Sequence, residues 1–508
     1  MTTQKQKIIN IDDLAELLPE IKKDNKIVLC HGVFDLLHIG HIKYLESAKT
    51  AGDVLVVTVT PDKYVNKGPD RPAFTESLRC EAIAALEVVD YVALNKWPTA
   101  VETINLLKPD IYAKGSEYKV SENDLTGMIV EEQRALQENG GSMHFTDDIV
   151  FSSTKLLNQF SADYPEETRK FFQTVIVEHG EKEVLGIIDR AQSLKVLVLG
   201  EAILDEYNYC EMIGIASKDP AIAVKYLSHE RFCGGILAVA NNVAGFCDTV
   251  DLIAMVGENE TEEHFIREHL SQKVNPTFFY KRASPTIIKK RFVAEGTVIQ
   301  KMFEVHNINT QDLDESEEKT LQEMIFSRIK DYDLVLVVDF GHGFISRNTA
   351  RMISENATFL AVNTQANSGN KGFNVISKYP SADFICLNDL EIRLEERHHP
   401  GTVFDMVKSV SEKLSCPLTI VTQGKEGCIC YNGESMLTIP AFAKKVVDRI
   451  GSGDAMIALA SLCAVQRASL QITGMVGNAA ASVAVSTVGH RSSIEKIAFK
   501  KYLSVLLK

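Results

Sequence analysis

The sequence lacks the features that mark a membrane-spanning, secreted or nucleic-acid-binding protein. It contains no run of 18 apolar residues, so a membrane-spanning helix is not expected. The first ten residues, MTTQKQKIIN, have no apolar segment of the signal-peptide kind. Basic residues number 54 against 68 acidic ones, a net charge of −14, so a broad basic surface for nucleic acid is not expected either. We therefore expect a cytoplasmic protein that binds neither membranes nor nucleic acid.

Zinc-type cysteine pairs are also lacking. The ten cysteines are scattered along the chain, with no CxxC pair at zinc spacing. In a cytoplasmic protein such cysteines are best explained as reduced, buried thiols. The chain has 508 residues, of which 45% are hydrophobic, enough for two to four globular domains of ordinary composition.

Predicted strands and helices alternate through the first third of the chain. The segment 53–59, DVLVVTV, is almost continuously apolar, as in a parallel strand covered on both faces. Alternating strands and helices predict an α/β fold with a doubly wound parallel sheet, whose ligands collect at the carboxyl ends of the strands. The predicted strands are 27–30, 53–59, 88–94 and 110–113, and the predicted helices are 11–23, 75–87 and 98–107.

The segment HGVFDLLHIGH, at 31–41, follows the first of these strands directly. Gly32 permits a tight turn in which the backbone can approach a ligand. If a helix begins near Ile39, the imidazoles of His38 and His41 lie together near its N-terminus. Free backbone amides and two imidazoles at one place predict a phosphate site. Two unrelated surface histidines are the alternative.

This segment resembles the GxFDxxHxGH signature of cytidylyltransferase-like nucleotidylyltransferases, and the resemblance extends over about residues 25–160. It implies a Rossmann-like fold in which the histidines contact nucleotide phosphates and stabilise charge during attack on the α-phosphorus. Positioning and electrostatics carry such a reaction without a covalent intermediate. The resemblance makes His38 and His41 catalytic and assigns nucleotide contacts to Gly32, Phe34, Asp35 and Gly40.

Three further segments of this region match the same family. The loop Lys67-Gly68-Pro69-Asp70-Arg71-Pro72 resembles a KGxxRP segment, and Lys114-Gly115-Ser116-Glu117-Tyr118 resembles a KGxDY-like segment. Plain polar loops are the alternative for both. Ser152-Ser153-Thr154-Lys155 is expected to open a helix, as an anion site or as an ordinary N-cap. The resemblance implies a catalytic role for Lys67 and nucleotide contacts for Arg79, Lys114, Gly115, Ser153 and Thr154.

A second strand-and-helix pattern begins with KVLVLG at 195–200 and ends with the motif DRIGSGDA at 448–455. Two glycines precede Asp454, and an apolar helix follows. Backbone amides at this helix start can hold a transferring phosphoryl group, and Asp454 stands where a base can accept a hydroxyl proton. A glycine turn with an aspartate cap is the alternative.

Residues 194–495 resemble the ribokinase-like, phosphofructokinase-B-type sugar kinases, so a second doubly wound α/β domain is expected. The resemblance makes Asp454 the catalytic base. It implies nucleotide contacts at Thr422, Gly424, Gly427, Gly451, Gly453 and Asn478. It implies sugar contacts at Asp205, Gly234, Gly235 and Asn242, and magnesium contacts at Asn388 and Glu391.

Some positions depart from the pattern of that family. An asparagine after the glycine pair is replaced by Ala238, and a lysine after the Asp339-Phe340-Gly341 segment is replaced by His342. A DPK-like segment is replaced by Asn363-Thr364-Gln365, and an acidic residue is replaced by Met302. These changes lie near the expected sugar and phosphate sites, so we expect the reaction type to be kept and the substrate to differ.

Together the two halves resemble the bifunctional heptose-7-phosphate kinases and heptose-1-phosphate nucleotidylyltransferases of ADP-heptose synthesis, with the domain order reversed. We predict a nucleotidylyltransferase domain at 1–160, a helical linker at 161–192 and a kinase domain at 193–508. The resemblance implies ATP and Mg²⁺, a sugar phosphate substrate and a homodimer formed through the kinase domain. The alternative is a CTP-dependent cytidylyltransferase for a polyol or sugar phosphate, whose second half is a non-catalytic binding or dimerisation module.

Overall fold

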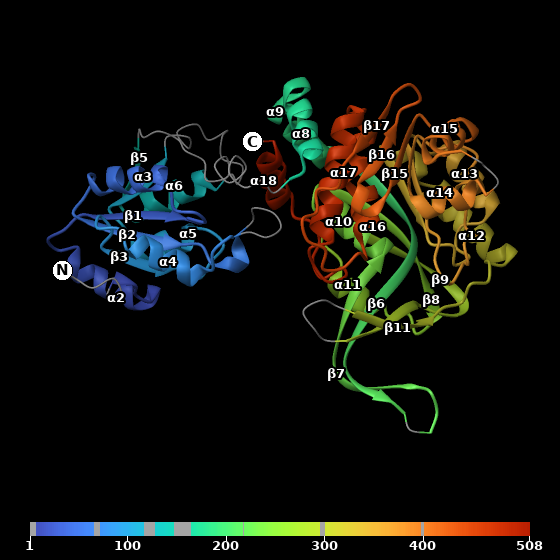
Figure 1. Ribbon diagram of the computed structural model, residues 1–508, viewed down its shortest axis with the longest axis horizontal. Helices are drawn as coiled ribbons and strands as arrows, with labels where there is room; N and C mark the ends of the chain where they lie inside the picture. The colour runs from blue at the N-terminus through green and yellow to red at the C-terminus, as the bar shows by residue number, and fades with distance from the viewer. Residues whose placement is uncertain are drawn as a thin grey trace. The chain divides into compact units, whose positions relative to one another are not determined.

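The computed structural model describes residues 7–65, 72–115, 128–146, 164–216, 218–294, 300–397 and 401–507. The chain divides into two compact units. The first comprises Met1–Asp163 with the C-terminal segment Ile497–Leu506, and the second comprises Tyr164–Lys496. Each unit has a β-sheet of its own with helices packed against it (Figure 1).

The first unit contains a five-stranded sheet in the order β3-β2-β1-β4-β5. All four neighbouring pairs are parallel, which confirms the predicted doubly wound sheet. The strands are β1 (Ile27–Gly32), β2 (Val54–Val59), β3 (Tyr91–Leu94), β4 (Ile111–Gly115) and β5 (Ser142–Thr146). The helices are α2 (Ile11–Ile21), α3 (Ile39–Lys49), α4 (Glu76–Ala84), α5 (Val101–Leu107) and α6 (Ile129–Glu138).

Both faces of this sheet are covered, which explains why its strands are apolar at nearly every position. Successive side chains of β1 enter opposite cores because a strand alternates its faces. Val28 packs in one core with residues of α3 and α4, and Leu29 packs in the other with residues of α2, α5 and α6. Strands β1, β2 and β4 are parallel neighbours, so their carboxyl ends lie along one edge of the sheet, where ligands collect in folds of this kind.

The main sheet of the second unit has seven parallel strands, in the order β9-β8-β6-β12-β13-β14-β15, followed by antiparallel β16 and β17. Apart from β6, described next, its strands are β8 (Thr249–Asn259), β9 (Val274–Pro285), β12 (Leu334–Asp339), β13 (Leu360–Thr364), β14 (Phe384–Asn388), β15 (Leu418–Thr422), β16 (Cys428–Tyr431) and β17 (Met436–Ile439). This is the predicted second α/β domain.

Strand β6 (Lys195–Ile215) is much longer than the predicted strand at 195–200. Its first part pairs with β8 and β12 in the main sheet. Its second part leaves that sheet and pairs with β7 (Ile222–Gly235) and β10 (Ile287–Ala294), and β10 also pairs with β11 (Gln300–Asn307). The ends of β6 and β7 form an arm that projects from the body of this unit (Figure 1).

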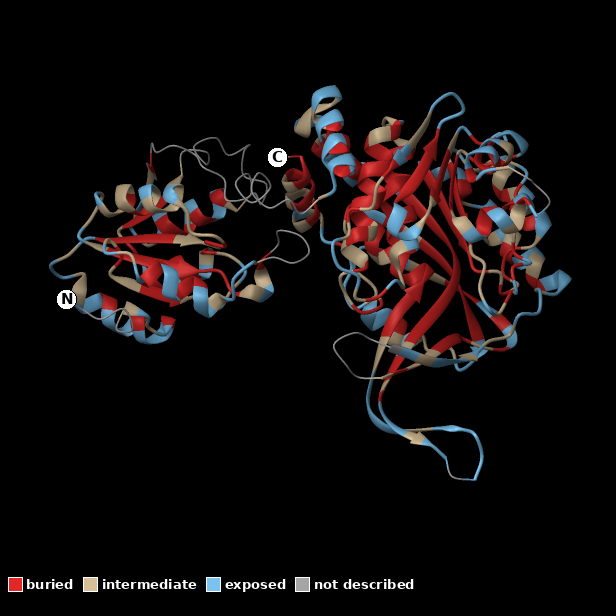
Figure 2. Cartoon of the chain, in the orientation of Figure 1, coloured by how far each residue is buried: buried red, intermediate tan, exposed pale blue. Residues whose placement is uncertain are grey.

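The helices of the second unit fall into a buried set and an outer set. Helices α10 (Ile236–Ala244), α16 (Ser452–Val465) and α17 (Leu470–Ala484) are rich in alanine and other apolar residues on all sides and lie in the red interior of Figure 2. The outer helices are α11 (Glu263–His269), α12 (Glu315–Phe326), α13 (Arg347–Asn356), α14 (Asp389–Glu395) and α15 (Val403–Lys413). Helix α18 (Lys496–Leu506) is the last helix of the chain and, from Ile497 on, is grouped with the first unit.

The predicted linker is helical, with α8 (Glu166–Glu178) and α9 (Gly180–Arg190). Both helices pack on the second unit. The rings of Phe171 and Phe172 lie with their centroids 6.0 and 4.8 Å from that of Phe442, and the Gln466 side chain donates to the Ile187 carbonyl at 3.0 Å. The domain boundaries given above stay a prediction.

All ten cysteines are free and buried, as expected of reduced thiols. Among the described residues, no helix is both long and apolar enough to cross a membrane.

Candidate functional site

In the first unit, the strand–turn–helix formed by residues 31–41 brings the two predicted histidines together. Helix α3 begins at Ile39, as predicted, and His38 is its N-cap, with the imidazole Nδ1 accepting from the Gly40 amide at 3.0 Å. The His38 and His41 rings stack with centroids 4.0 Å apart, and the Phe34 ring meets His41 edge-on at 5.4 Å. A helix start beside two imidazoles suits an anion.

The turn itself leaves no room for larger side chains. Phe34 has a positive φ of 48°, which is uncommon for a residue with a side chain. The Phe34 ring folds back over Gly32, where a Cβ would lie only 3.1 Å from it. A side chain at position 32 would press on the Phe34 ring, so glycine suits this position.

Arg79 and Asp35 are buried and hold the loops of this site together. Asp35 accepts a hydrogen bond from the Ala73 amide at 2.5 Å. The Arg79 side chain is 1% exposed and pairs with Asp62 at 2.6 Å. It also donates to the backbone carbonyls of Val33, Thr60 and Phe74. The structure thus shows positioning contacts for both residues, and the nucleotide contacts expected of them remain proposals.

Lys114 and Gly115 end β4, next to the strand that carries the motif. Because Cys30 of β1 pairs with Ala113 of β4, Lys114 lies at the same edge of the sheet as the motif. Its ammonium forms a buried ion pair with Glu132 at 2.9 Å. Lys67, Ser153 and Thr154 lie outside the described residues.

His31, the first histidine of the motif, differs from the other two. Its Nδ1 lies 2.9 Å from the Thr58 hydroxyl. Burial, with a smaller contribution from the Lys114 charge, lowers the pKa of His31 to about 3. A neutral, hydrogen-bonded imidazole inside the sheet supports the strand and offers no charge to a phosphate.

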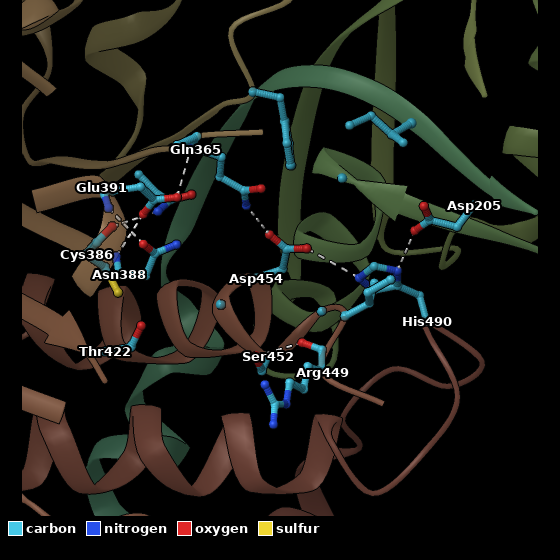
Figure 3. Close-up of a pocket in the computed structure, with 18 of the residues that line it drawn as sticks. Asp205, Gln365, Cys386, Asn388, Glu391, Thr422, Arg449, Ser452, Asp454 and His490 are labelled. Atoms are coloured by element: carbon cyan, nitrogen blue, oxygen red, sulfur yellow. Dashed lines mark hydrogen bonds and ion pairs between the residues drawn. The ribbon is translucent and has the colours of Figure 1, made fainter. Parts of the chain in front are cut away.

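In the second unit, a cavity of about 300 Å³ lies where strands of the main sheet end and α16 begins. Most of the predicted kinase residues line this cavity, although they come from segments far apart in the chain (Figure 3). The predicted residues in its wall are Asp205, Gly235, Asn388, Glu391, Thr422, Gly451, Gly453 and Asp454. The turn containing Gly424 and Gly427 directly follows Thr422, and Gly234 lies directly against Asp205.

The N-terminus of α16 opens into this cavity. Gly451 is the N-cap, with a positive φ of 83°, so its left-handed conformation favours glycine. Asp454 lies in the first turn, and both of its carboxylate oxygens are engaged. Oδ1 accepts from Gln365 Nε2 at 2.8 Å, and Oδ2 lies 3.3 Å from His490 Nε2.

Asp205 stands across the cavity from Asp454 and is held by two cations. Its Oδ2 lies 3.0 Å from His490 Nδ1, and its Oδ1 pairs with Arg291, which also contacts Glu304 at 3.1 Å. Burial alone would raise the pKa of Asp205, but Arg291 and His490 outweigh burial and hold it well below its usual range. Burial opposes protonation of His490, yet the two carboxylates raise its pKa to about 9, so the imidazole is charged at neutral pH.

Lys289 is a further cation in the wall of the cavity. It lies two residues before Arg291 on β10, so both side chains are on one face of that strand. Its side chain is buried, and among the described residues no carboxylate lies within ion-pair distance of its ammonium. Burial lowers the pKa of Lys289, with Asp205 opposing that change. The cavity therefore offers a positive charge to an anionic ligand.

Asn388 and Glu391 form a capping box at the start of α14. Glu391 accepts from the amides of Asn388 and Ala366, at 2.8 and 3.1 Å. Burial raises the pKa of Glu391 to about 7, and no described cation pairs with it. A buried carboxylate without a counter-charge, beside an amide oxygen, fits Mg²⁺, which keeps several waters and takes one or two protein oxygens. No larger metal-binding cluster occurs in the described part of the chain.

Five predicted kinase residues are outside the cavity wall: Gly234, Gly424 and Gly427, placed above, and Asn242 and Asn478. Asn242 accepts from the Ile494 amide at 3.0 Å, and Asn478 donates to the Pro440 carbonyl at 2.8 Å, so both hold neighbouring segments in place. Their ligand contacts remain proposals. Of the departures noted above, Asn363 and Gln365 do line the cavity, whereas His342 is buried away from it and Ala238 lies within α10.

Comparison with known families agrees with this division. A family model described as pfkB family carbohydrate kinase matches residues 193–497, and one described as cytidylyltransferase-like matches 29–159. The cytidylyltransferase-like region therefore precedes the kinase.

Curated relatives match the first unit. The bifunctional protein HldE of Campylobacter jejuni (strain RM1221) is 46% identical over 116 residues, which is 22% of this chain and 25% of the relative. The HldE protein of Nitratiruptor sp. is 47% identical over 103 residues, 20% of this chain and 22% of the relative. The chain spans about a quarter of the length of these curated relatives.

Solved structures match the kinase region at low sequence identity. Escherichia coli phosphofructokinase-2 in complex with fructose-6-phosphate is 18% identical with a TM-score of 0.48, covering 62% of this chain and 99% of that one. Thermotoga maritima ribokinase is 17% identical with a TM-score of 0.47, covering 61% and 99%.

Proposed function

Since the chain belongs to the pfkB family of carbohydrate kinases and carries a cytidylyltransferase-like domain ahead of the kinase, we propose that it makes a nucleotide-activated sugar in two steps. The second unit phosphorylates a sugar or sugar phosphate with ATP. The first unit then joins a sugar 1-phosphate to a nucleotide and releases pyrophosphate. The observation that carries this proposal is the pairing of the two domains with a first unit that resembles bifunctional HldE proteins. The product would be ADP-heptose-like, a precursor for surface glycans.

For the kinase step, Asp454 is the proposed base. It takes the proton of the acceptor hydroxyl as that oxygen attacks the γ-phosphorus of ATP and ADP leaves. The amides of the Gly451–Gly453 turn face the same cavity and can hold the moving charge. Thr422 and the turn at 424–427 would hold the nucleotide. Asn388 and Glu391 would hold Mg²⁺, which supplies positive charge beside the phosphates when bound.

For the nucleotidyl step, the two imidazoles at the start of α3 are the proposed stabilisers. A phosphate oxygen of the sugar 1-phosphate attacks the α-phosphorus of the nucleotide, and pyrophosphate leaves. His38 and His41 lie beside the helix amides, so they can donate to the phosphoryl oxygens as charge builds up. Lys67, Lys114, Ser153 and Thr154 are proposed to contact the phosphates.

The proposed assembly is a homodimer formed through the arm of β6 and β7. The arm exposes large apolar side chains, among them Ile213 at 68% and Ile215 at 76%, and also Met212, Ile222 and Tyr226. Apolar residues on a two-stranded ribbon outside the body of a protein favour pairing with a second copy. We propose the cytoplasm as the place of the reaction.

Mass spectrometry of the reaction products tests this function. The full chain is incubated with ATP or CTP and a panel of sugars, sugar phosphates and sugar 1-phosphates. We expect an ADP-sugar and pyrophosphate with ATP, and D454N should make that product only from a supplied 1-phosphate. A CDP-polyol as sole product, formed equally by D454N, would instead favour the CTP-dependent alternative with a non-catalytic second unit. The two engaged oxygens of Asp454 are the observation that favours this alternative.

A further inference from the structure

His490 spans the gap between the two carboxylates of the kinase cavity. Asp205 comes from β6 and Asp454 from α16, and the imidazole presents one nitrogen to each, at 3.0 and 3.3 Å. Figure 3 shows the ring between the two carboxylates, with a dashed line to each. His490 itself lies in the loop between α17 and α18, so its side chain is not fixed by a helix or strand of its own.

The ring fills the space next to two glycines, Gly451 at the start of α16 and Gly234 near the end of β7. A Cβ at Gly451 would lie 2.6 Å from His490 Nε2. A Cβ at Gly234 would lie 3.4 Å from His490 Nδ1 and 2.2 Å from Asp205 Oδ2. Because both residues are glycines, there is room between them for the imidazole of His490.

This occupation conflicts with the proposed base. A hydroxyl that gives its proton to Asp454 must lie within hydrogen-bond distance of one carboxylate oxygen. Gln365 takes one oxygen and His490 faces the other. Each oxygen could accept a second hydrogen bond, but on the side of Asp205 the imidazole fills the space beside Oδ2, so an acceptor hydroxyl that approaches from that side must displace His490.

We propose that His490 is the specificity-determining residue of the kinase, closing the acceptor site until an acceptor supplies two hydroxyls that replace its two hydrogen bonds. The class of acceptor is a sugar with a pair of neighbouring hydroxyls, one bound by Asp205 and the other delivered to Asp454. A single hydroxyl, including that of water, replaces only one bond and leaves the ring in place. The inference rests on the proposed kinase function.

The exchange also changes the charge of the cavity. His490 carries its positive charge between two carboxylates, so its departure leaves negative charge behind. Arg291 remains paired with Asp205, and Lys289 has no carboxylate partner among the described residues. Asp454 then keeps only the hydrogen bond from Gln365, and its Oδ2 can serve as the base that the reaction needs.

ATP hydrolysis without acceptor tests the inference, because it requires no knowledge of the sugar. In this reaction a water oxygen attacks the γ-phosphorus, the bond to ADP breaks, and Asp454 takes a proton from the water. If His490 covers the base, H490A should hydrolyse ATP at least about tenfold faster than wild type, since a positioned base contributes roughly 10²–10⁴-fold. H490A/D454N should lose that gain. H264A, a change at an exposed histidine of α11, is the matched control.

A second measurement concerns the acceptor. The best acceptor of the wild type is compared with its analogues lacking one hydroxyl. H490A should phosphorylate the deoxy analogues with a smaller loss of kcat/KM than wild type shows, and H490Q, which keeps one donor, should fall between them. Equal ATP hydrolysis by wild type and H490A, or an unchanged penalty for the deoxy analogues, would overturn the role of His490. If the wild type phosphorylates a sugar and H490A hydrolyses ATP no faster than the wild type, only this inference is rejected. If no variant phosphorylates any sugar, the proposed kinase function is rejected as well.

Discussion

The first candidate site draws its central groups from eleven consecutive residues, whereas the second collects side chains from β6, β10, α14, α16 and the loop after α17. In the first site, one turn and one helix start determine how His38 and His41 lie. In the second, Asp205 and His490 meet although they are 285 positions apart in the chain. The first geometry depends on local backbone conformation, and the second depends on the whole sheet. We therefore expect a substitution in one unit to impair the reaction of that unit and to leave the reaction of the other unit intact.

The largest expected effect comes from replacing Asp454, the proposed general base of the kinase, and it should distinguish the reactions of the two units. D454N keeps the volume and one acceptor oxygen but cannot accept the proton. Sugar phosphorylation should fall by about 10²–10⁴-fold, the contribution of a positioned general base. ATP binding, measured by calorimetry, should change little. Nucleotidyl transfer from a supplied sugar 1-phosphate is the control and should persist.

The reciprocal change is H41A in the first unit. Losing one donor to the transition state should slow pyrophosphate release by about 10²–10³-fold. Sugar phosphorylation should continue, so the 1-phosphate intermediate should accumulate and be detected by mass spectrometry. If pyrophosphate release stays near normal in a folded H41A protein, the role of the stacked imidazoles is refuted.

The third effect is on stability and concerns the long-range contacts of the second site. The folded pKa of His490 is about 9, above the ordinary histidine value of about 6.5, so its charge stabilises the folded state fully below pH 6.5. That contribution is lost as pH rises through 9, and its size is about 3 kcal/mol at most, at about 1.4 kcal/mol per pKa unit. Denaturant unfolding of wild type and H490Q between pH 6 and 10 measures it. The difference between the two proteins should shrink with rising pH, and a constant difference would contradict the buried ion pairs.

The smallest effect concerns the arm. Replacing both Ile213 and Ile215 by serine removes apolar area from the proposed dimer contact. Each partly buried isoleucine contributes on the order of 1 kcal/mol, so the dissociation constant should rise by about tenfold or more. Sedimentation equilibrium measures this, with V177S as a control at another exposed apolar position, on α8. An unchanged constant would place the contact elsewhere.

Local patterns predicted the first site and only part of the second. The helix start at Ile39 and the parallel strands were predicted because turn chemistry and apolar runs act over a few residues. The glycine–aspartate turn at the start of α16 was predicted for the same reason. His490 was missed, since nothing in its loop indicates which carboxylates it will meet.

Lys289 and Arg291 could have been found. Strand β10 carries three consecutive cations among apolar residues, and the first and third of them, Lys289 and Arg291, must share one face. Such a pair inside a domain suggests an anionic partner. The extension of β6 beyond the predicted strand was missed for another reason. Its outer half is stabilised by pairing with β7 and β10, which no local pattern indicates.

The continuity of β6 gives the second unit a mechanical link. One unbroken backbone runs from the main sheet to the arm, and Asp205 lies on it four residues beyond Glu201, the last residue paired with β8. Hydrogen bonds to β7 and β10 stiffen this stretch on both sides. The strand therefore connects the outer end of the arm to Asp205 through paired backbone, with register shifts against β7 between Tyr209 and Cys210 and between Met212 and Gly214. The proposed contact between two arms would therefore act on the same strand that carries Asp205.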